Sequence, residues 1–350
     1  MTHQPLDYSL NRPGSLIAAL PAVLGFVPEK SLVLVSIEDG VLGAVMRVDL
    51  PDALAQDLDP LADILASASP EGAVAVIVDA DGAGCPVCND EYRMLAGDLG
   101  DALRAQAIDL WAVHVVDRVQ SGGRWHCADG CGERGLVDDP EVSPLAVAAV
   151  VGGRRLYGSR ADLQKVIAAE NGADSLVSRI QQVDEDTRAG RAEDPDGCTR
   201  RAVLAAIRAA GRVAAGKRLS DAVLAELAHH LTDSAARDAL YALAVGRDAG
   251  RAEALWTLLS RRLPQPWRLE ALVLLAFSAY VRGDGPLAGI ALSEALRCNP
   301  AHRMAGMLDK ALQSGMRPEQ IGELALTGYR VADRIGIELP PRERFGRRAG

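Results

Sequence analysis

The sequence LEALVLLAFSAYVRGDGPLAGIALSEALRCNPAH, residues 269–302, predicts two helices joined by a tight turn. Leucine and alanine recur at spacings of three and four residues on both sides of Gly283-Asp284, which is the period of a helix with an apolar face. Glycine is typical of such a turn, and aspartate often begins the helix that follows. Proline in Asn299-Pro300 ends the second helix because it lacks an N–H donor. The stretch therefore predicts a helical hairpin.

The same pattern is found 34 residues earlier in the chain. Three positions hold identical residues in both copies: Ala288, Leu292 and Pro300 correspond to Ala254, Leu258 and Pro266. Paired helices that repeat every 34 residues resemble the tetratricopeptide repeat. That resemblance implies a concave surface for a peptide or protein partner and no catalytic chemistry. The alternative is an ordinary array of alanine-rich helical hairpins.

Residues before about position 140 follow a different pattern, in which short apolar strands alternate with helices. Ser31–Ile37 and Val41–Val48 predict a hairpin, and the apolar runs Ala73–Val78 and Leu110–Val116 predict two buried strands. A short fifth strand starts at Arg124. Since helices connect the second, third and fourth strands, right-handed crossovers make these three parallel. The first and fifth strands then run antiparallel to them, in a mixed α/β sheet covered by helices.

The fold class is therefore a two-part α+β chain, with an N-terminal mixed α/β sheet and C-terminal tetratricopeptide-like helical hairpins. Residues 1–140 form the mixed α/β domain with cysteine-rich loops, and residues 141–197 a helical connector and polar linker. Residues 198–338 form a helical repeat-like domain. Residues 339–350 are a basic tail with four arginines: Arg342, Arg344, Arg347 and Arg348.

Charge distinguishes the two halves of the chain. Residues 1–150 carry 8 Lys+Arg against 23 Asp+Glu, a net charge of −15, whereas residues 151–350 carry 30 against 24, a net charge of +6. Together they make the net charge of −9 for the whole chain. The positive excess is modest and its arginines are spread along helices, which argues against a nucleic-acid partner.

Composition and sequence also indicate where the protein acts. With 49% hydrophobic and 24% charged residues, the chain is typical of a globular protein, which excludes a disordered or collagen-like chain. No apolar run approaches the ~18 residues of a membrane span. The segment Met1–Asn11 has no Lys or Arg, unlike a secretion signal. We therefore expect a cytoplasmic protein that does not bind membranes; nothing in the sequence specifies its oligomeric state.

Several short motifs occur in combination along the chain. They include Gly25–Leu32 (GFVPEKSL), Arg47–Pro51 (RVDLP) and Gly123-Arg124-Trp125 followed by two cysteines. In this combination the chain resembles a large actinobacterial family, domain of unknown function 4192, over nearly its full length. The resemblance implies fold and lineage but no activity. The chain departs from the commoner pattern by the single Trp125 and by an added Cys85-x-x-Cys88.

Three aspartates at the ends of predicted strands form the first candidate site. Asp49, Asp79 and Asp117 end the second, third and fourth strands. Because the carboxyl ends of parallel strands share one sheet edge, these carboxylates would meet there and hold a divalent cation such as Mg²⁺. Such a site would suit metal-dependent phosphoryl transfer or nucleotide chemistry. The alternative is turn chemistry, because aspartate is common where strands end.

Four of the six cysteines fall in two closely spaced pairs, which form the second candidate site. Cys85-x-x-Cys88 follows the third strand, and Cys127-x-x-x-Cys131 follows the fifth. Two such pairs can supply four thiolates to one tetrahedral Zn²⁺, so a structural zinc site is predicted. A disulfide or redox pair and unliganded thiols are the alternatives. A redox role for the first pair is disfavoured because the next helix is expected only from Asp90, with acidic residues that raise thiol pKa values.

Arg124 and Trp125 are candidate ligand-binding residues, since arginine pairs with and stacks on bound molecules. A tryptophan that covers the core at the sheet margin is the alternative. The sequence contains no complete catalytic motif. The favoured function is therefore a non-catalytic adaptor that binds a protein partner through the helical repeat. The second hypothesis is a metal-dependent enzyme that uses the strand-end aspartates.

Overall fold

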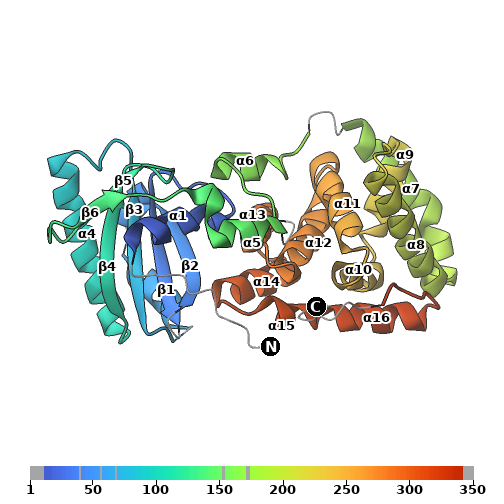
Figure 1. The fold of residues 1–350 in the computed structure, drawn as a ribbon. Coiled ribbons are helices and arrows are strands. Elements are labelled where there is room, and N and C mark those ends of the chain that lie inside the picture. Colours follow the sequence, from blue (N-terminus) through green and yellow to red (C-terminus); the bar gives the residue numbers. More distant parts are fainter. Residues whose placement is uncertain are drawn as a thin grey trace. The chain divides into compact units, whose positions relative to one another are not determined.

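The computed structural model describes residues 12–38, 41–55, 57–67, 69–151, 154–170 and 174–341. The chain divides into two compact units, residues 1–163 and residues 164–350 (Figure 1). The four arginines of the predicted basic tail lie outside the described residues.

A six-stranded sheet forms the centre of the first unit, in the order β2-β1-β3-β4-β5-β6. Its strands are β1 Ser31–Glu38, β2 Val41–Asp49, β3 Gly72–Val78, β4 Asp109–Val116, β5 Arg124–Cys127 and β6 Arg134–Leu136. Only β3 and β4 pair in parallel; the other neighbours are antiparallel. The predicted strand directions are thus confirmed. The sixth strand was not predicted, because three residues are too few to show an alternating pattern.

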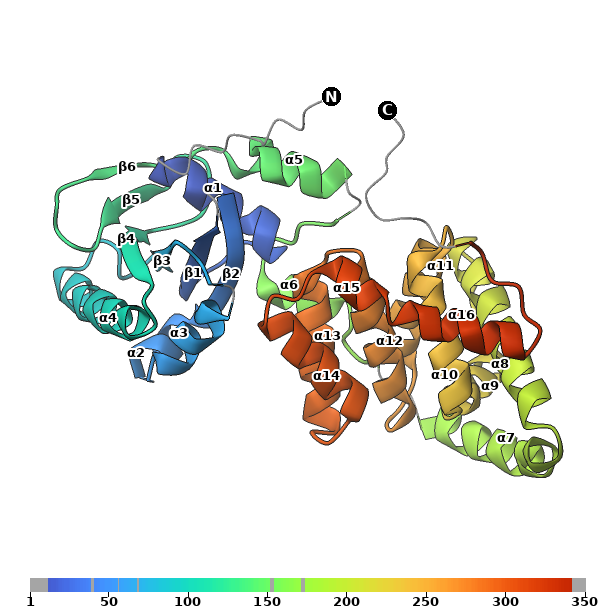
Figure 2. The same ribbon diagram turned by 90° about the horizontal axis from the view of Figure 1, so that it is seen from below.

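Helices cover both faces of this sheet (Figure 2). One face carries α2 (Leu50–Ala55), α3 (Asp59–Ala66) and α4 (Pro86–Ala105), and the other face carries α1 (Pro13–Leu24), against which α5 (Pro144–Val151) packs. The short helix η1 (Pro140–Val142) precedes α5 in the chain, and α6 (Arg160–Lys165) follows it. Apart from Tyr92, the described core beneath α2–α4 is aliphatic, which agrees with the low content of aromatic residues.

The helix α4 forms because its apolar residues follow the helical period. Leu95, Leu99 and Leu103 recur every four residues and are all buried against the sheet. Pro86 stands in the first turn, where its missing N–H costs nothing. The helix therefore begins four residues earlier than the predicted start at Asp90, and it includes the second cysteine of the first pair.

The second unit is built from helices, and its described residues contain no strand. The helices are α7 Asp174–Glu193, α8 Pro195–Ala214, α9 Asp221–His230, α10 Ser234–Tyr241, η2 Ala242–Val245, α11 Ala249–Arg262, α12 Trp267–Val281, α13 Gly285–Cys298, α14 Arg303–Gln313, α15 Pro318–Gly322 and α16 Ala325–Arg334. Most of the predicted polar linker is the helix α7, which packs against α9. Its buried Leu176 and Ile180 supply the apolar contacts.

The helical hairpin predicted over residues 269–302 is formed by α12 and α13. Gly283 makes the turn with φ of +82°, a conformation that favours glycine. The Asp284 side chain accepts a hydrogen bond from the N–H of Leu287 and so caps α13. The helix α12 is almost entirely buried, since α11, α13, α14 and α15 all pack against it.

The last two helices fold back over the array. The helix α16 packs on α10, and α15 packs on α12 (Figure 2). Gly328 brings α16 very close to α10, because a Cβ at this position would lie 2.5 Å from the carbonyl oxygen of Asp238. The C-terminal helices α15 and α16 therefore cover part of the surface of α12 and α10.

Candidate functional site

The strand-end aspartates lie at the same edge of the sheet. Ser31, at the start of β1, pairs with Asp49 on one side and with Val78 on the other. Asp79 follows β3 directly, and Asp117 follows the parallel neighbour β4. However, β1 lies between β2 and β3, so Asp49 and Asp79 are two strands apart. Within the described residues, these three side chains form no metal-binding group.

Asp79 is fixed by a hydrogen-bonded turn. Its carboxylate accepts hydrogen bonds from the Tyr92 hydroxyl at 2.7 Å and from the N–H of Asp81 at 3.0 Å. Burial raises the pKa of Asp79, but these bonds and one from the N–H of Gly82 outweigh it, so that the pKa is lowered overall. Burial and the bond to Asp79 both raise the pKa of Tyr92. Asp79 therefore ties the end of β3 to α4 as an ionised acceptor.

The other two aspartates have separate partners. Asp117 accepts a 2.8 Å hydrogen bond from the N–H of Arg124 and so closes the turn between β4 and β5. Asp49 pairs with the neighbouring Arg47 at 2.6 Å. These contacts are the turn and edge chemistry that was the alternative interpretation of the three residues.

The second cysteine pair lies in a group that could hold a metal ion. The ligand atoms of Cys127, Cys131 and Glu133 all lie within 4.8 Å of one another. Cys127 ends β5, and its sulfur is 3.6 Å from Nδ1 of the buried His114. Burial and the hydrogen bond to Cys131 raise the pKa of Cys127 to about 12. Since a metal binds the thiolate, it would have to displace this proton.

The first cysteine pair is not part of that group. Cys88 packs against the core between the sheet and α4. Cys127 is paired in register with His114 and points to the opposite face, because Val113 and Val115 on either side of His114 face α4. The alternation of side chains in β5 thus places Cys127 and Cys88 on different faces of the sheet. Of the four predicted zinc ligands, the metal-binding group in the described residues includes Cys127 and Cys131.

Arg124 and Trp125 point to opposite faces of β5. Arg124 is exposed, whereas Trp125 is buried and packs edge-to-face on His114, with ring centroids 5.1 Å apart. The indole also lies against Gly135, where a Cβ would come within 2.9 Å of Nε1. Trp125 therefore fills the core beneath α1, and only the exposed Arg124 is available to a ligand.

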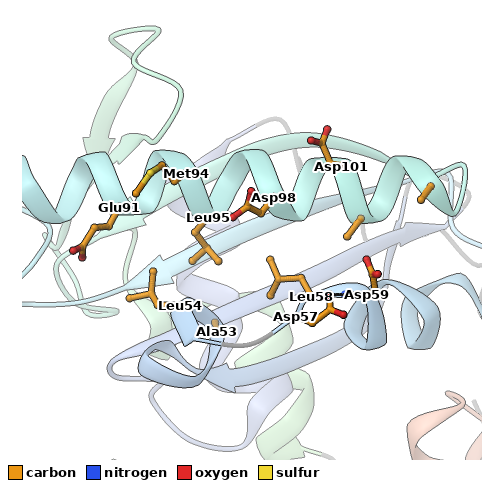
Figure 3. A pocket seen from close by; sticks show the side chains of 12 residues that line it. Ala53, Leu54, Asp57, Leu58, Asp59, Glu91, Met94, Leu95, Asp98 and Asp101 are labelled. Atoms are coloured by element: carbon orange, nitrogen blue, oxygen red, sulfur yellow. Dashed lines mark hydrogen bonds between the residues drawn. The ribbon is translucent and has the colours of Figure 1, made fainter.

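A groove of about 790 Å³ lies between α4 and the α2–α3 segment (Figure 3). Its apolar part includes Leu54 and Met94, whose side chains are 43% and 65% exposed. Among the described residues, five carboxylates line it: Asp57, Asp59, Glu91, Asp98 and Asp101. None of the described lining residues is Lys or Arg. The groove therefore combines an exposed apolar floor with an acidic rim.

Comparison with known families assigns the chain to one of them. The model of the family described as domain of unknown function (DUF4192) matches residues 13–319, which include parts of both units. The chain belongs to this family. Neither a curated protein nor a solved structure matches it. In this DUF4192 protein, the described helices include none that is both long enough and apolar enough to span a membrane.

Two sets of residues in this DUF4192 protein were not predicted as sites. Glu133 completes the group around Cys127, but a single glutamate in a short loop gives no sequence signal. The groove residues Glu91, Met94, Asp98 and Asp101 do have a signal, since their spacing of three and four residues places them on one face of a helix. The other wall of the groove comes from α2 and α3. Because these helices are far from α4 in the sequence, the sequence pattern did not predict that they form a groove with it.

Proposed function

We propose that the chain is an adaptor whose groove between α4 and the α2–α3 segment binds a helix of a protein partner. The observation that carries this proposal is the groove itself, with exposed apolar side chains and five carboxylates but no lining cation. A helix with an apolar face flanked by Lys and Arg complements both features. Amphipathic helices commonly bind in grooves of this kind through apolar residues spaced three and four apart.

The dimensions of the groove support a helical occupant. Glu91 and Asp101 are ten residues apart on α4, which corresponds to about 15 Å along the helix axis. This length accommodates about three turns of a second helix. The carboxylates stand at the exposed rim, where they attract a cationic partner and contribute more to its rate of association than to its affinity.

The helical unit supplies a second surface to the same adaptor. We infer tetratricopeptide-like hairpins from α10–α11 and α12–α13, with α14 as the next helix. Because α15 and α16 cover α10 and α12, the partner would bind at the end of the array instead. Among the described residues of this unit, all the exposed large apolar side chains lie in its last part: Met307, Met316, Leu324 and Leu326. An exposed apolar group of this kind favours a protein partner.

The groove is tested with a synthetic leucine–lysine amphipathic helix of about four turns, labelled with a fluorophore. Fluorescence anisotropy with the full chain should show saturable binding that weakens as salt is added. Asp98→Lys and Met94→Ser should each weaken binding roughly tenfold, which is ~1.4 kcal/mol. The control Glu71→Lys reverses an exposed charge outside the groove and should weaken binding much less. Equal losses in all three variants would refute a specific groove.

We also propose zinc as the metal of the Cys127–Cys131–Glu133 group. Two thiolates and a carboxylate are a ligand set that Zn²⁺ accepts in tetrahedral geometry, with His114 or water as the fourth ligand. The free state of all six cysteines supports a reducing, cytoplasmic location. The combination of sequence motifs supports an actinobacterial origin.

A further inference from the structure

The first cysteine pair lies at the start of a helix that connects two parallel strands. The strands β3 and β4 are parallel neighbours, and α4 is the crossover between them. Cys85 is the residue that precedes this 20-residue helix, and Cys88 lies in its first turn. The first N–H groups of a helix have no partner within the helix and favour negative charge. A Cys-x-x-Cys at this place in a βαβ unit is the arrangement of a redox-active dithiol.

The two sulfurs have different environments. The nearby N–H groups of Cys88 and Val87 and the Cys88 thiol lower the pKa of Cys85, although the Cys85 side chain accepts no capping hydrogen bond of regular geometry. Repulsion from Glu91 opposes this but is the smaller effect. The hydrogen bond to Cys85, burial and nearby negative charge raise the pKa of Cys88. Cys85 is thus the better nucleophile, and Cys88 remains a thiol beside it.

The site is accessible to another molecule. Cys85 and Cys88 are both half-buried, and the side chain between them, Val87, is 68% exposed. Asn89 stabilises the loop before the helix, because its side-chain amide donates to the carbonyl oxygens of Ala83 and Cys85 at 3.0 and 2.8 Å. Val87 is an exposed apolar residue in the first turn of α4, so it can contact a substrate without moving the thiols.

We propose that Cys85 and Cys88 form a redox-active dithiol that undergoes thiol–disulfide exchange with a disulfide substrate. This activity goes beyond the adaptor function and does not depend on it. A helix that begins only at Asp90 would leave the two cysteines in a loop, but α4 begins at Pro86, directly after Cys85. The nearby acidic residue Glu91 still opposes the thiolate, but it is outweighed at Cys85.

The exchange has two steps. The Cys85 thiolate attacks one sulfur of the substrate disulfide, so that a Cys85–substrate disulfide forms and one substrate thiolate leaves. The Cys88 thiol passes its proton to that thiolate through solvent and then attacks the Cys85 sulfur, which releases the second substrate thiolate. The dithiol loses two electrons and becomes the Cys85–Cys88 disulfide, and the substrate disulfide gains them. A low-molecular-weight thiol can restore the dithiol by the reverse reaction.

The second cysteine pair is an internal control for this chemistry. Cys127 is buried at the end of a strand, and its raised pKa disfavours the thiolate. Cys131 is exposed but does not begin a helix. The first pair therefore lies at the N-terminus of a helix and the second does not, although both pairs lie in the same unit of the chain.

The test uses the reduced full chain and the small disulfide 5,5′-dithiobis(2-nitrobenzoate) at pH 6, with the product mapped by peptide mass spectrometry. Cys85 should react roughly tenfold faster than Cys131, because more of it is thiolate at this pH. The wild type should end with a Cys85–Cys88 disulfide and no retained probe. In Cys88→Ser, the probe should remain attached to Cys85. In Cys298→Ser, a control in the other unit, the Cys85–Cys88 disulfide should form as in the wild type.

Two results would overturn the proposal. One is a Cys85 that reacts no faster than Cys131 in the folded wild type. The other is a probe adduct that persists on Cys85 although Cys88 is present. Circular dichroism of each variant separates these results from loss of folding. The probe is a small molecule that does not use the groove, so a negative result in this test does not contradict the proposed helix binding. Likewise, a groove that binds no helix would not contradict the proposed redox activity of Cys85 and Cys88.

Discussion

Individual side chains decide whether the second cysteine pair binds a metal. If Cys127, Cys131 and Glu133 hold zinc, added Zn²⁺ should raise the melting temperature of the full chain, because a ligand that binds only the folded state stabilises it. At a free concentration of about 100 times the Kd, the stabilisation is ~2.7 kcal/mol. Thermal unfolding with and without zinc measures it.

Matched variants distinguish this site from a four-cysteine site. Cys131→Ser should abolish the zinc effect, and Glu133→Gln should weaken it. Cys85→Ser should leave it unchanged, since Cys85 lies outside the group. A zinc effect that disappears in Cys85→Ser would instead support one site built from both pairs.

Single residues also show what sequence reasoning can and cannot reach. The two cysteine pairs and the three aspartates were visible as residue types in short motifs. Which face of the sheet each side chain occupies depends on register, and register was not available from one sequence. Cys127 and Cys88 therefore seemed able to meet, although the alternation of β5 places them on opposite faces.

Among the helices, the contact between α16 and α10 depends on one glycine. Gly328 has no room for a side chain, since a Cβ would lie 2.5 Å from the carbonyl oxygen of Asp238 and 2.9 Å from the Cβ of Ala242. Gly328→Ala should therefore lower the free energy of unfolding by ~1–3 kcal/mol through overpacking. Chemical denaturation of the full chain measures the change.

The control for this prediction is another helical glycine. Gly306 lies in α14, and a Cβ there would meet no atom within 4 Å. Gly306→Ala should be neutral or stabilise by up to ~1 kcal/mol, because alanine favours the helix. If both substitutions stabilised the chain alike, α16 would not pack on α10 as described.

The helical period in the sequence predicted which segments are helices better than it predicted where the helices end or how they pack. The hairpin α12–α13 was predicted because its apolar spacing, turn glycine and final proline agree. The helix α7 was taken as linker because its sequence is mostly polar; among its side chains that the structure describes, only Leu176 and Ile180 are buried. The packing of α16 on α10 could not be predicted, since it joins segments about 90 residues apart through small side chains.

The division of the chain into two compact units predicts two separable unfolding transitions. Each unit has its own buried polar contact with which to test this. In the first unit, Tyr92 donates to the Asp79 carboxylate; in the second, the buried Arg268 pairs with Glu294 and donates to the carbonyl oxygens of Ser260 and Ile167. Tyr92→Phe should destabilise the first unit by about 2 kcal/mol. Arg268→Ala should destabilise the second by about 3 kcal/mol.

The pH dependence provides an independent check on the same contacts. Hydrogen bonds from Arg297 and Arg268 lower the pKa of Glu294 to about 2, and hydrogen bonds lower the pKa of Asp79 overall. A carboxyl group whose folded pKa is lowered stabilises the fold above its unfolded pKa near 4, and this stabilisation is lost as the pH falls through the folded value. The difference in the free energy of unfolding between the wild type and each variant should therefore be largest at pH 7 and become smaller towards pH 2.

Calorimetry of the full chain at pH 7 should resolve the two transitions, and each variant should move only one of them. This follows because each contact joins residues within a single unit, so its loss lowers the stability of that unit directly. Tyr280→Phe is the control for the acid effect, because the Tyr280 hydroxyl donates to the neutral carbonyl oxygen of Met316. The loss of stability in this variant should therefore not change with pH. A single transition that both variants shift equally would mean that the two units unfold as one cooperative body.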